Sequence, residues 1–221
     1  MTQEERNFRI MCKYIPEKAA PLIVKWVTLF DFKLKITKER NSKLGDYRPP
    51  YNGSNHQITI NHNLNKYSFL VTLVHEIAHL TCYNNHGNKV NPHGEEWKKE
   101  FKNLMSNFLS KEIFPDDVLY GLMAHMRNPA ASSCSDPKLL RILKRHDEEG
   151  KSGNYFFLEK LPYKTKFLHN GDRLFEKGEK RRTRFSCTEL ATGNIYLFHA
   201  LAEVELFEPI SHVESSFKIE F

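Results

Sequence analysis

Residues 71–101 read VTLVHEIAHLTCYNNHGNKVNPHGEEWKKEF, and this stretch contains four histidines: His75, His79, His86 and His93. The first two enclose a glutamate, Glu76, in the order His-Glu-x-x-His. On a helix, residues four apart lie one turn above each other on the same face. His75 and His79 could therefore offer two imidazoles to one tetrahedral Zn²⁺, while Glu76 on the adjoining flank could hold a water without binding the metal.

The residues around this motif predict a helix from about Tyr67 to Cys82 with two distinct faces. Aliphatic residues recur at a helical spacing and cluster on one side: these are Leu70, Leu73, Val74, Ile77 and Leu80. His75 and His79 fall near the opposite side, beside Val71 and Thr72. Core histidines that are satisfied by hydrogen bonds would lie among the aliphatic residues, so this separation favours a metal site.

A catalytic zinc of this kind needs a third protein ligand and keeps its fourth position for water. The sequence leaves three alternatives open. His86 is out of register with the known arrangement in which a histidine follows the second ligand by six residues. A glutamate, Glu96 or Glu100, is the second alternative. The third is His93, which heads the buried stripe of a second helix predicted over about residues 92–109, and whose ring should therefore point inward. We favour His93.

The remaining sequence predicts an α+β fold. Helix is expected over residues 4–29, with a break near Pro16 and Pro21, and again from Asp136 to about His146. Three short strands are expected at 32–38, 42–50 and 57–63, and β-type segments follow a linker at 147–154. The predicted domains are a metallopeptidase-like domain at 1–147, a β-rich module at 150–209 and a tail at 210–221. The expected core of the β module is Phe156, Phe157, Phe167, Leu174, Phe185, Tyr196 and Phe198.

The segments HEIAHL and NPHGEEWKKEF resemble the two motifs of the SprT-like family of zinc metallopeptidases, in which His-Glu-x-x-His precedes a His-Gly-x-x-Trp/Phe element. The resemblance covers roughly residues 15–145. It implies a zincin-like fold, Zn²⁺ bound by His75, His79 and His93, and Glu76 as the catalytic residue that moves the proton of the attacking water. The substrate would be a protein or peptide.

The C-terminal stretch resembles the tail module of SprT-like proteins from Bacteroidetes. Many members of the family end in a four-cysteine zinc ribbon, but this chain has no Cys-x-x-Cys pair and cannot form one.

Two further roles can be assigned only as alternatives. The transition state needs an oxyanion stabiliser, for which Tyr83, His86 and Arg127 are candidates. The segment QITIN, if it forms the edge of the sheet beside the cleft, could pair with an extended substrate.

Nucleic acid is a candidate partner on two grounds. Residues 1–146 carry 22 Lys and Arg against 14 Asp and Glu, whereas residues 147–221 carry 11 against 13. Eukaryotic members of the SprT-like family digest proteins cross-linked to DNA, so the resemblance also implies DNA. A phosphate-binding patch is expected in the run EKGEKRRTR, although a solvated hairpin would explain the same residues: Lys177, Lys180, Arg181, Arg182 and Arg184. The basic helix KLLRILKRH is a second candidate surface.

Composition narrows the class of protein. No run approaches the roughly 18 apolar residues of a membrane span, and the first residues, MTQEERNFRI, lack the apolar segment of a secretory signal. The four cysteines are far apart, which is typical of a reducing cytoplasm. We therefore predict a cytoplasmic zinc metallopeptidase. The alternative is a non-proteolytic zinc-containing protein that binds nucleic acid or protein, but a purely structural zinc would have no need of Glu76.

Overall fold

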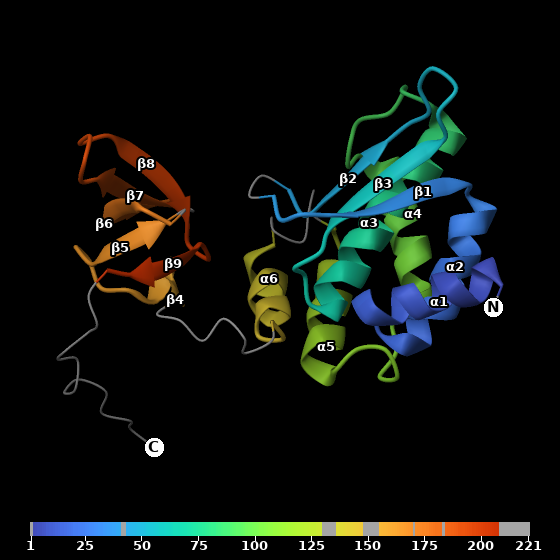
Figure 1. The fold of residues 1–221 in the computed structure, drawn as a ribbon, viewed down its shortest axis with the longest axis horizontal. Helices are drawn as coiled ribbons and strands as arrows, with labels where there is room; N and C mark the ends of the chain where they lie inside the picture. Colours follow the sequence, from blue (N-terminus) through green and yellow to red (C-terminus); the bar gives the residue numbers. More distant parts are fainter. Residues whose placement is uncertain are drawn as a thin grey trace. The chain divides into compact units, whose positions relative to one another are not determined.

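The computed structural model describes residues 2–40, 43–129, 136–147, 155–169, 171–182 and 184–207 (Figure 1). The chain divides into two compact units, Met1–Glu148 and Glu149–Phe221. The expected tail and most of the expected linker lie outside the described residues. The described part mixes helices and strands, as the predicted α+β class requires. None of the described helices has the length and apolar composition needed to cross a bilayer.

The first unit begins with two helices, α1 (Gln3–Tyr14) and α2 (Ala20–Leu29), joined by the short 3-10 helix η1 (Glu17–Ala19). Thr2 and Glu5 close the start of α1 with a reciprocal capping box. Pro21 lies in the first turn of α2, where a missing backbone N–H leaves no hydrogen bond unmade. The predicted break between two helices is therefore confirmed.

A three-stranded sheet follows, with β1 (Phe32–Thr37), β2 (Gly45–Arg48) and β3 (His56–Asn61) in the order β1-β3-β2. β3 runs parallel to β1 and antiparallel to β2. The three strands are confirmed, but QITIN does not lie at the edge of the sheet, so the condition for its pairing with a substrate is not met. That segment lies in β3, in the middle of the sheet, and its Ile58 and Ile60 are completely buried on the side that faces the helices. β2 is an edge strand instead.

The central helix is α3 (Lys66–His86), which packs against β2 and β3 (Figure 1). Asn65 caps its start by accepting hydrogen bonds from the amides of Tyr67 and Ser68. The helix ends at Gly87, whose φ of 64° suits glycine. Its five predicted core aliphatics are all fully buried. Val71 and Thr72, on the other side, are buried as well, so neighbouring elements also cover much of the histidine side.

The next helix is α4 (Glu95–Met105), continued by η2 (Ser106–Phe108). Its predicted buried stripe is confirmed, but its start is not, because Gly94 and not Asn91 is the residue before the first turn. Two helices complete the unit: α5 (Asp116–His125), which the sequence analysis missed, and α6 (Pro137–Lys144), which starts at Asp136 as predicted.

The second unit is a six-stranded antiparallel sheet in the order β4-β9-β5-β6-β7-β8. Its elements are β4 (Tyr155–Phe157), η4 (Leu158–Lys160), β5 (Lys166–His169), β6 (Arg173–Arg181), β7 (Arg184–Glu189), β8 (Ile195–His199) and β9 (Glu203–Leu206).

The predicted core of this unit is only partly right. Phe167 and Phe185 are buried, but Phe156 and Tyr196 are 38% and 37% exposed. Of the other predicted core residues, Phe157, Leu174 and Phe198 are half-buried. The residue that fills the core from β6 is Phe175, at 1% exposure. Side chains alternate between the faces of a strand, so the burial of Phe175 turns Leu174 to the other face.

Candidate metal centre

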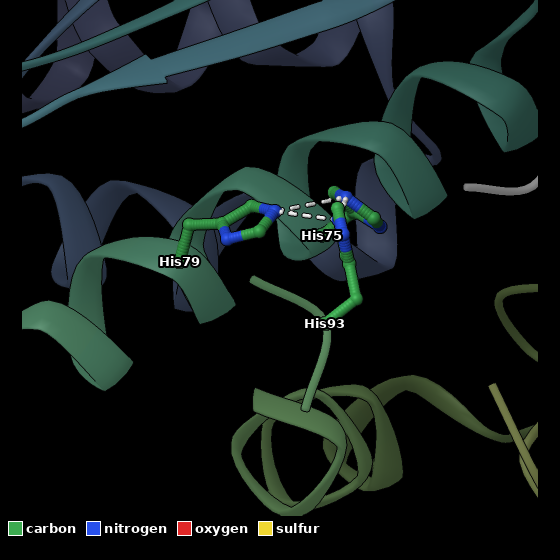
Figure 2. A group of neighbouring side chains, drawn as sticks. All are labelled: His75, His79 and His93. Atoms are coloured by element: carbon green, nitrogen blue, oxygen red, sulfur yellow. Dashed lines mark hydrogen bonds between the residues drawn. The ribbon is translucent and has the colours of Figure 1, made fainter. Parts of the chain in front are cut away.

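Three histidine side chains from two segments of the first unit converge on one point (Figure 2). His75 and His79 come from successive turns of α3, and His93 comes from the turn before α4. The Nε2 atoms of His75 and His79 are 3.2 Å apart, those of His79 and His93 are 2.9 Å apart, and those of His93 and His75 are 3.2 Å apart. The donor set can hold a metal ion.

The distances suit a shared cation better than mutual hydrogen bonds. A ring nitrogen carries either one proton or one lone pair, so three nitrogens that face a common point cannot all satisfy one another. Two imidazole ligands of a tetrahedral zinc, each about 2.0–2.1 Å from the ion, lie roughly 3.3 Å from each other. The three separations of 2.9–3.2 Å are close to this value.

His93 reaches the site from a tight turn and not from the first turn of a helix, so that part of the sequence interpretation is wrong. The backbone amide of Gly94 donates to the carbonyl of Asn91 at 2.9 Å, which closes a four-residue turn with Pro92 and His93 in its centre. His93 has a φ of 61°, in the left-handed region that non-glycine residues rarely adopt. This turn, and not a helical stripe, aims the imidazole at α3.

An aromatic wall from α4 backs the three imidazoles. The indole ring of Trp97 lies 4.6 Å from the ring of His75, 5.3 Å from that of His79 and 4.7 Å from that of His93. Phe101 stacks behind Trp97 at 5.1 Å. The Nε1 atom of Trp97 is buried and has no hydrogen-bond partner among the described residues. Helical periodicity predicts a buried stripe for this helix but does not indicate that the stripe covers the histidines.

This enclosure keeps the imidazoles neutral, which is the form that binds metals. Burial lowers the pKa of His79 to about 4, and the proximity of His93 adds to the effect. Burial, followed by the neighbouring histidines, lowers the pKa of His75 well below its ordinary value. Burial also lowers the pKa of His93.

Glu76 follows His75 on α3, and its side chain is buried against the edge strand β2. A Cβ atom placed on Gly45 would lie 2.6 Å from Oε1 of Glu76 and 2.8 Å from Cγ2 of Thr72, so the strand can approach this closely only with glycine at that position. Burial and, to a smaller extent, the charge of Asp46 raise the pKa of Glu76 to about 8, against the lowering effects of the backbone amide of Tyr47 and of the Lys43 and Arg40 charges. A cation bound nearby would lower this pKa again.

The comparison with protein families matched residues 20–117 of the chain to the SprT-like family. The chain carries a SprT-like domain. This domain includes the sheet, α3 and α4, and therefore His75, Glu76, His79 and His93. Neither the comparison with curated proteins nor the comparison with solved structures gave a match.

The alternative ligands lie outside the three-histidine group of the SprT-like domain. His86 is exposed in the last turn of α3. Glu100 accepts a hydrogen bond from Asn85 at 3.0 Å on the exposed side. Of the three oxyanion candidates, His86 and Arg127 are exposed, whereas Tyr83 is partly buried one turn beyond His79.

Tyr83 belongs to an aromatic group that the sequence analysis did not identify. Its ring lies 6.4 Å from the ring of Tyr47 and 5.9 Å from that of His56, and Tyr47 and His56 share a hydrogen bond of 2.8 Å. The three residues come from α3, β2 and β3, so spacing along the sequence could not have brought them together.

The structure divides the predicted basic patch of the second unit. Lys177 is only 4% exposed. Its Nζ donates to the carbonyl of Leu161 and lies 4.2 Å from the ring centre of Phe185, so it cannot reach a surface ligand. The other four side chains are exposed around the β6–β7 turn: Lys180, Arg181, Arg182 and Arg184.

Proposed function

We propose that the chain is a zinc-dependent metallopeptidase of zincin-like architecture that hydrolyses peptide bonds. The observation that carries this proposal is the convergence of three imidazole nitrogens, one of them from the residue that precedes the buried Glu76. His75, His79 and His93 would hold the metal. Three nitrogen ligands leave a tetrahedral ion one free position, as catalytic zinc sites require.

The donor set suits zinc, because imidazole nitrogens bind this borderline ion well and oxygen-seeking ions such as Mg²⁺ prefer carboxylates. A zinc ion bound there would polarise the scissile carbonyl and make water acidic enough to attack near neutral pH. Trp97 restricts the approach of solvent from the α4 side and keeps the imidazoles neutral.

Glu76 would act as the general base and then as the general acid. Its carboxylate would take a proton from the attacking water and deliver it to the nitrogen of the leaving amine. The close packing of Gly45 holds that carboxylate in place, which lowers the entropic cost of reaching the reactive geometry. Tyr83 is the best-placed of the three oxyanion candidates, because His79 and Tyr83 lie one turn apart on α3.

The edge strand β2 would bind the substrate. β2 pairs with β3 along one side only in the described sheet, so its other side can accept an extended peptide as an added strand. This role falls to β2 and not to QITIN, since β3 is central.

Replacing Glu76 with glutamine tests the mechanism directly. Glutamine keeps the shape of the side chain but cannot accept the proton. We expect the variant to retain zinc, measured by mass spectrometry of the purified protein, and to lose at least about a hundredfold in the rate of casein cleavage. A variant that cuts as fast as wild type would contradict the role of Glu76.

The second candidate function is non-proteolytic binding of nucleic acid or protein around a zinc-stabilised fold. The observation in its favour is the group of four exposed cations at the β6–β7 turn. The burial of Glu76 beside the metal ligands favours the peptidase, as does the resemblance that implies DNA-associated proteins as substrates.

All three described cysteines are free thiols, Cys12, Cys82 and Cys187, and this supports our proposal of a cytoplasmic location.

A further inference from the structure

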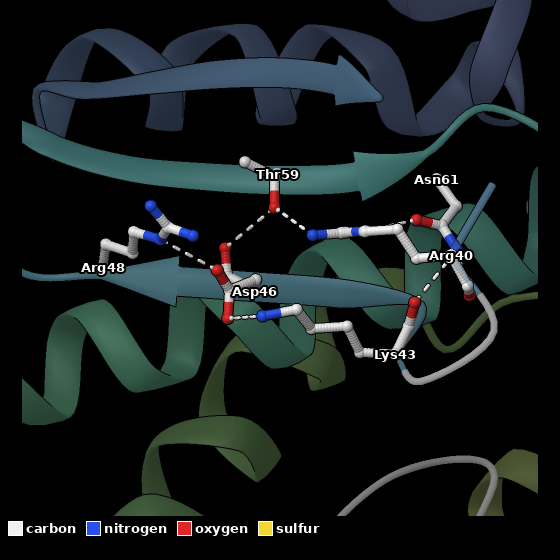
Figure 3. Close-up of polar contacts among 6 residues, drawn as sticks. All are labelled: Arg40, Lys43, Asp46, Arg48, Thr59 and Asn61. Carbon is white, nitrogen blue, oxygen red and sulfur yellow. Dashed lines mark hydrogen bonds and ion pairs between the residues drawn. The ribbon is translucent and has the colours of Figure 1, made fainter. Parts of the chain in front are cut away.

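The face of the three-stranded sheet that points away from α3 is polar and strongly basic (Figure 3). We call it the outer face. Its strand residues follow from the register: Gln57 lies between Lys33 and Arg48, and Thr59 lies between Lys35 and Asp46. Lys33, Lys35 and Arg48 are exposed, and Asp46 is the single acidic residue in the sequences of the three strands.

Two more cations reach this face from the segment between β1 and β2. Arg40 lies over β3, where its Nε donates to Oδ1 of Asn61 at 2.8 Å and its Nη1 donates to Oγ1 of Thr59 at 3.1 Å (Figure 3). Its Nη2 is buried and has no partner among the described residues. Lys43 forms an ion pair with Asp46 at 2.6 Å.

The charges on the outer face do not balance. Asp46 is already shared, because Arg48 pairs with its second oxygen at 3.0 Å. In the described part of the chain, no ion pair is present at Lys33, Lys35 or Arg40. A face with five cations, one carboxylate within its strands and Asp31 at its border keeps a surplus of positive charge, which attracts a polyanion.

The outer face continues into a hollow of about 670 Å³ beside the β2–β3 turn. Lys33, Arg48 and Gln57 line it together with Tyr51, which is 76% exposed, and with Asp31, whose carboxylate accepts a hydrogen bond from Asn55 at 2.8 Å. An exposed aromatic ring next to a row of cations is the combination with which proteins bind single-stranded nucleic acid, since phosphates take the cations and an unpaired base stacks on the ring.

We propose that the outer face binds the phosphodiester backbone of single-stranded nucleic acid, with Tyr51 stacking on a base. The aromatic ring favours this ligand over an acidic protein segment, which would use the cations alone. The proposed contact lies on a different unit from the cations of the β6–β7 turn, and it does not depend on the metal site or on peptidase activity.

The test compares charge reversals on the outer face and elsewhere on the same unit. Lys33→Glu/Lys35→Glu changes two exposed residues of the outer face, and Lys18→Glu/Lys25→Glu, two exposed residues of η1 and α2 in the same unit, is the matched control. Binding of a labelled 30-nucleotide single strand is followed by fluorescence anisotropy at several salt concentrations, with DNA and RNA arms and with a duplex of the same length. Circular dichroism checks that each variant is folded.

We expect the outer-face variant to weaken single-strand binding about tenfold or more and to reduce the slope of log K against log salt by about 1.4, as the loss of two phosphate contacts requires. The control should stay within about twofold of wild type. Tyr51→Ala should weaken single-strand binding about fivefold or more and leave duplex binding unchanged.

Three results would overturn the proposal. The first is no binding of any strand by the wild type at low salt, and the second is an equal or larger loss in the control variant. The third is an acidic polyglutamate competitor that displaces the strand at equal charge concentration, because the face would then recognise negative charge of any kind.

Discussion

Replacing His93 with glycine and, separately, with alanine tests whether the turn at residues 91–94 holds this imidazole under strain. Both substitutions remove the ring and its contact with Trp97, so they differ only in backbone freedom. The φ of 61° at His93 costs a non-glycine residue roughly 1–2 kcal/mol. Glycine avoids that cost but loses about 0.5–1 kcal/mol more conformational entropy on folding than alanine does.

The difference leaves His93→Gly more stable than His93→Ala by about 0.5–1 kcal/mol in the absence of metal. Urea unfolding of both variants in the presence of a chelator measures this difference. Added zinc should raise the stability of wild type by about 4 kcal/mol at a free concentration a thousand times its Kd. Both variants should lose most of this gain, because two imidazoles remain where three converged.

Two results would refute this reasoning. Equal stability of the glycine and alanine variants would mean that the turn is not strained. A zinc-dependent gain as large in either variant as in wild type would mean that His93 is not a ligand.

Three other substitutions have expected outcomes of their own. Gly45→Ala should reduce casein cleavage about tenfold or more with unchanged zinc content, because the added Cβ would displace the carboxylate of Glu76; unchanged cleavage would rule out this positioning. Burial lowers the pKa of Lys177, so the folded state binds fewer protons than the unfolded state and stability should rise as pH increases towards about 10.4. Lys177→Met should flatten the rise in stability that thermal unfolding measures between pH 8 and 10.5. A rise as steep as that of wild type would contradict the assignment of this pH dependence to Lys177. Asp136→Ala should destabilise the first unit by about 1–2 kcal/mol in urea unfolding, because the residue caps α6 and pairs with His125 at 2.9 Å. Asp136→Asn keeps the cap and should lose less stability than Asp136→Ala. Equal losses of stability in the two variants would assign the effect to the pairing with His125 and not to the cap.

The helical part of the site could be predicted because it depends on local periodicity. The spacing of His75 and His79 and the aliphatic residues of α3 are properties of one helix, and the structure places all five of those aliphatics in the core. The structure brings His93 to the other two histidines, but by a route that the sequence did not predict. The sequence suggested a helix start at Asn91-Pro92, whereas the chain turns there and the helix begins at Glu95.

Contacts between distant segments could not be predicted from spacing. Nothing in the sequence SKLGDYR indicates that Gly45 lies against Glu76, because the approach of β2 to α3 depends on the sheet order. For the same reason the sequence could not show whether QITIN lies at an edge or in the middle of the sheet. A central strand is the segment that its neighbours cover on both sides. The burial of β3 depends on its packing against α3 and its pairing with β1, which are contacts between distant segments.

Two wrong predictions could have been avoided from the sequence alone: which face of β6 points to the core, and the absence of a helix where α5 lies. If Phe175 faces the core, the alternation of side chains along a strand also turns Lys177 inward, and the structure buries both. The sequence PDDVLYGLMAH carries a proline and two acidic residues at a helix start, and it forms α5 as those signals indicate.

The most direct test of the metal centre is zinc X-ray absorption on the purified chain. The account predicts one zinc per chain with three imidazole nitrogens at about 2.0–2.1 Å and one oxygen ligand, and one nitrogen fewer in His93→Ala. A chain that binds no zinc would contradict the central claim. So would a site with sulfur ligands or with four protein ligands, since neither would leave the position that water needs.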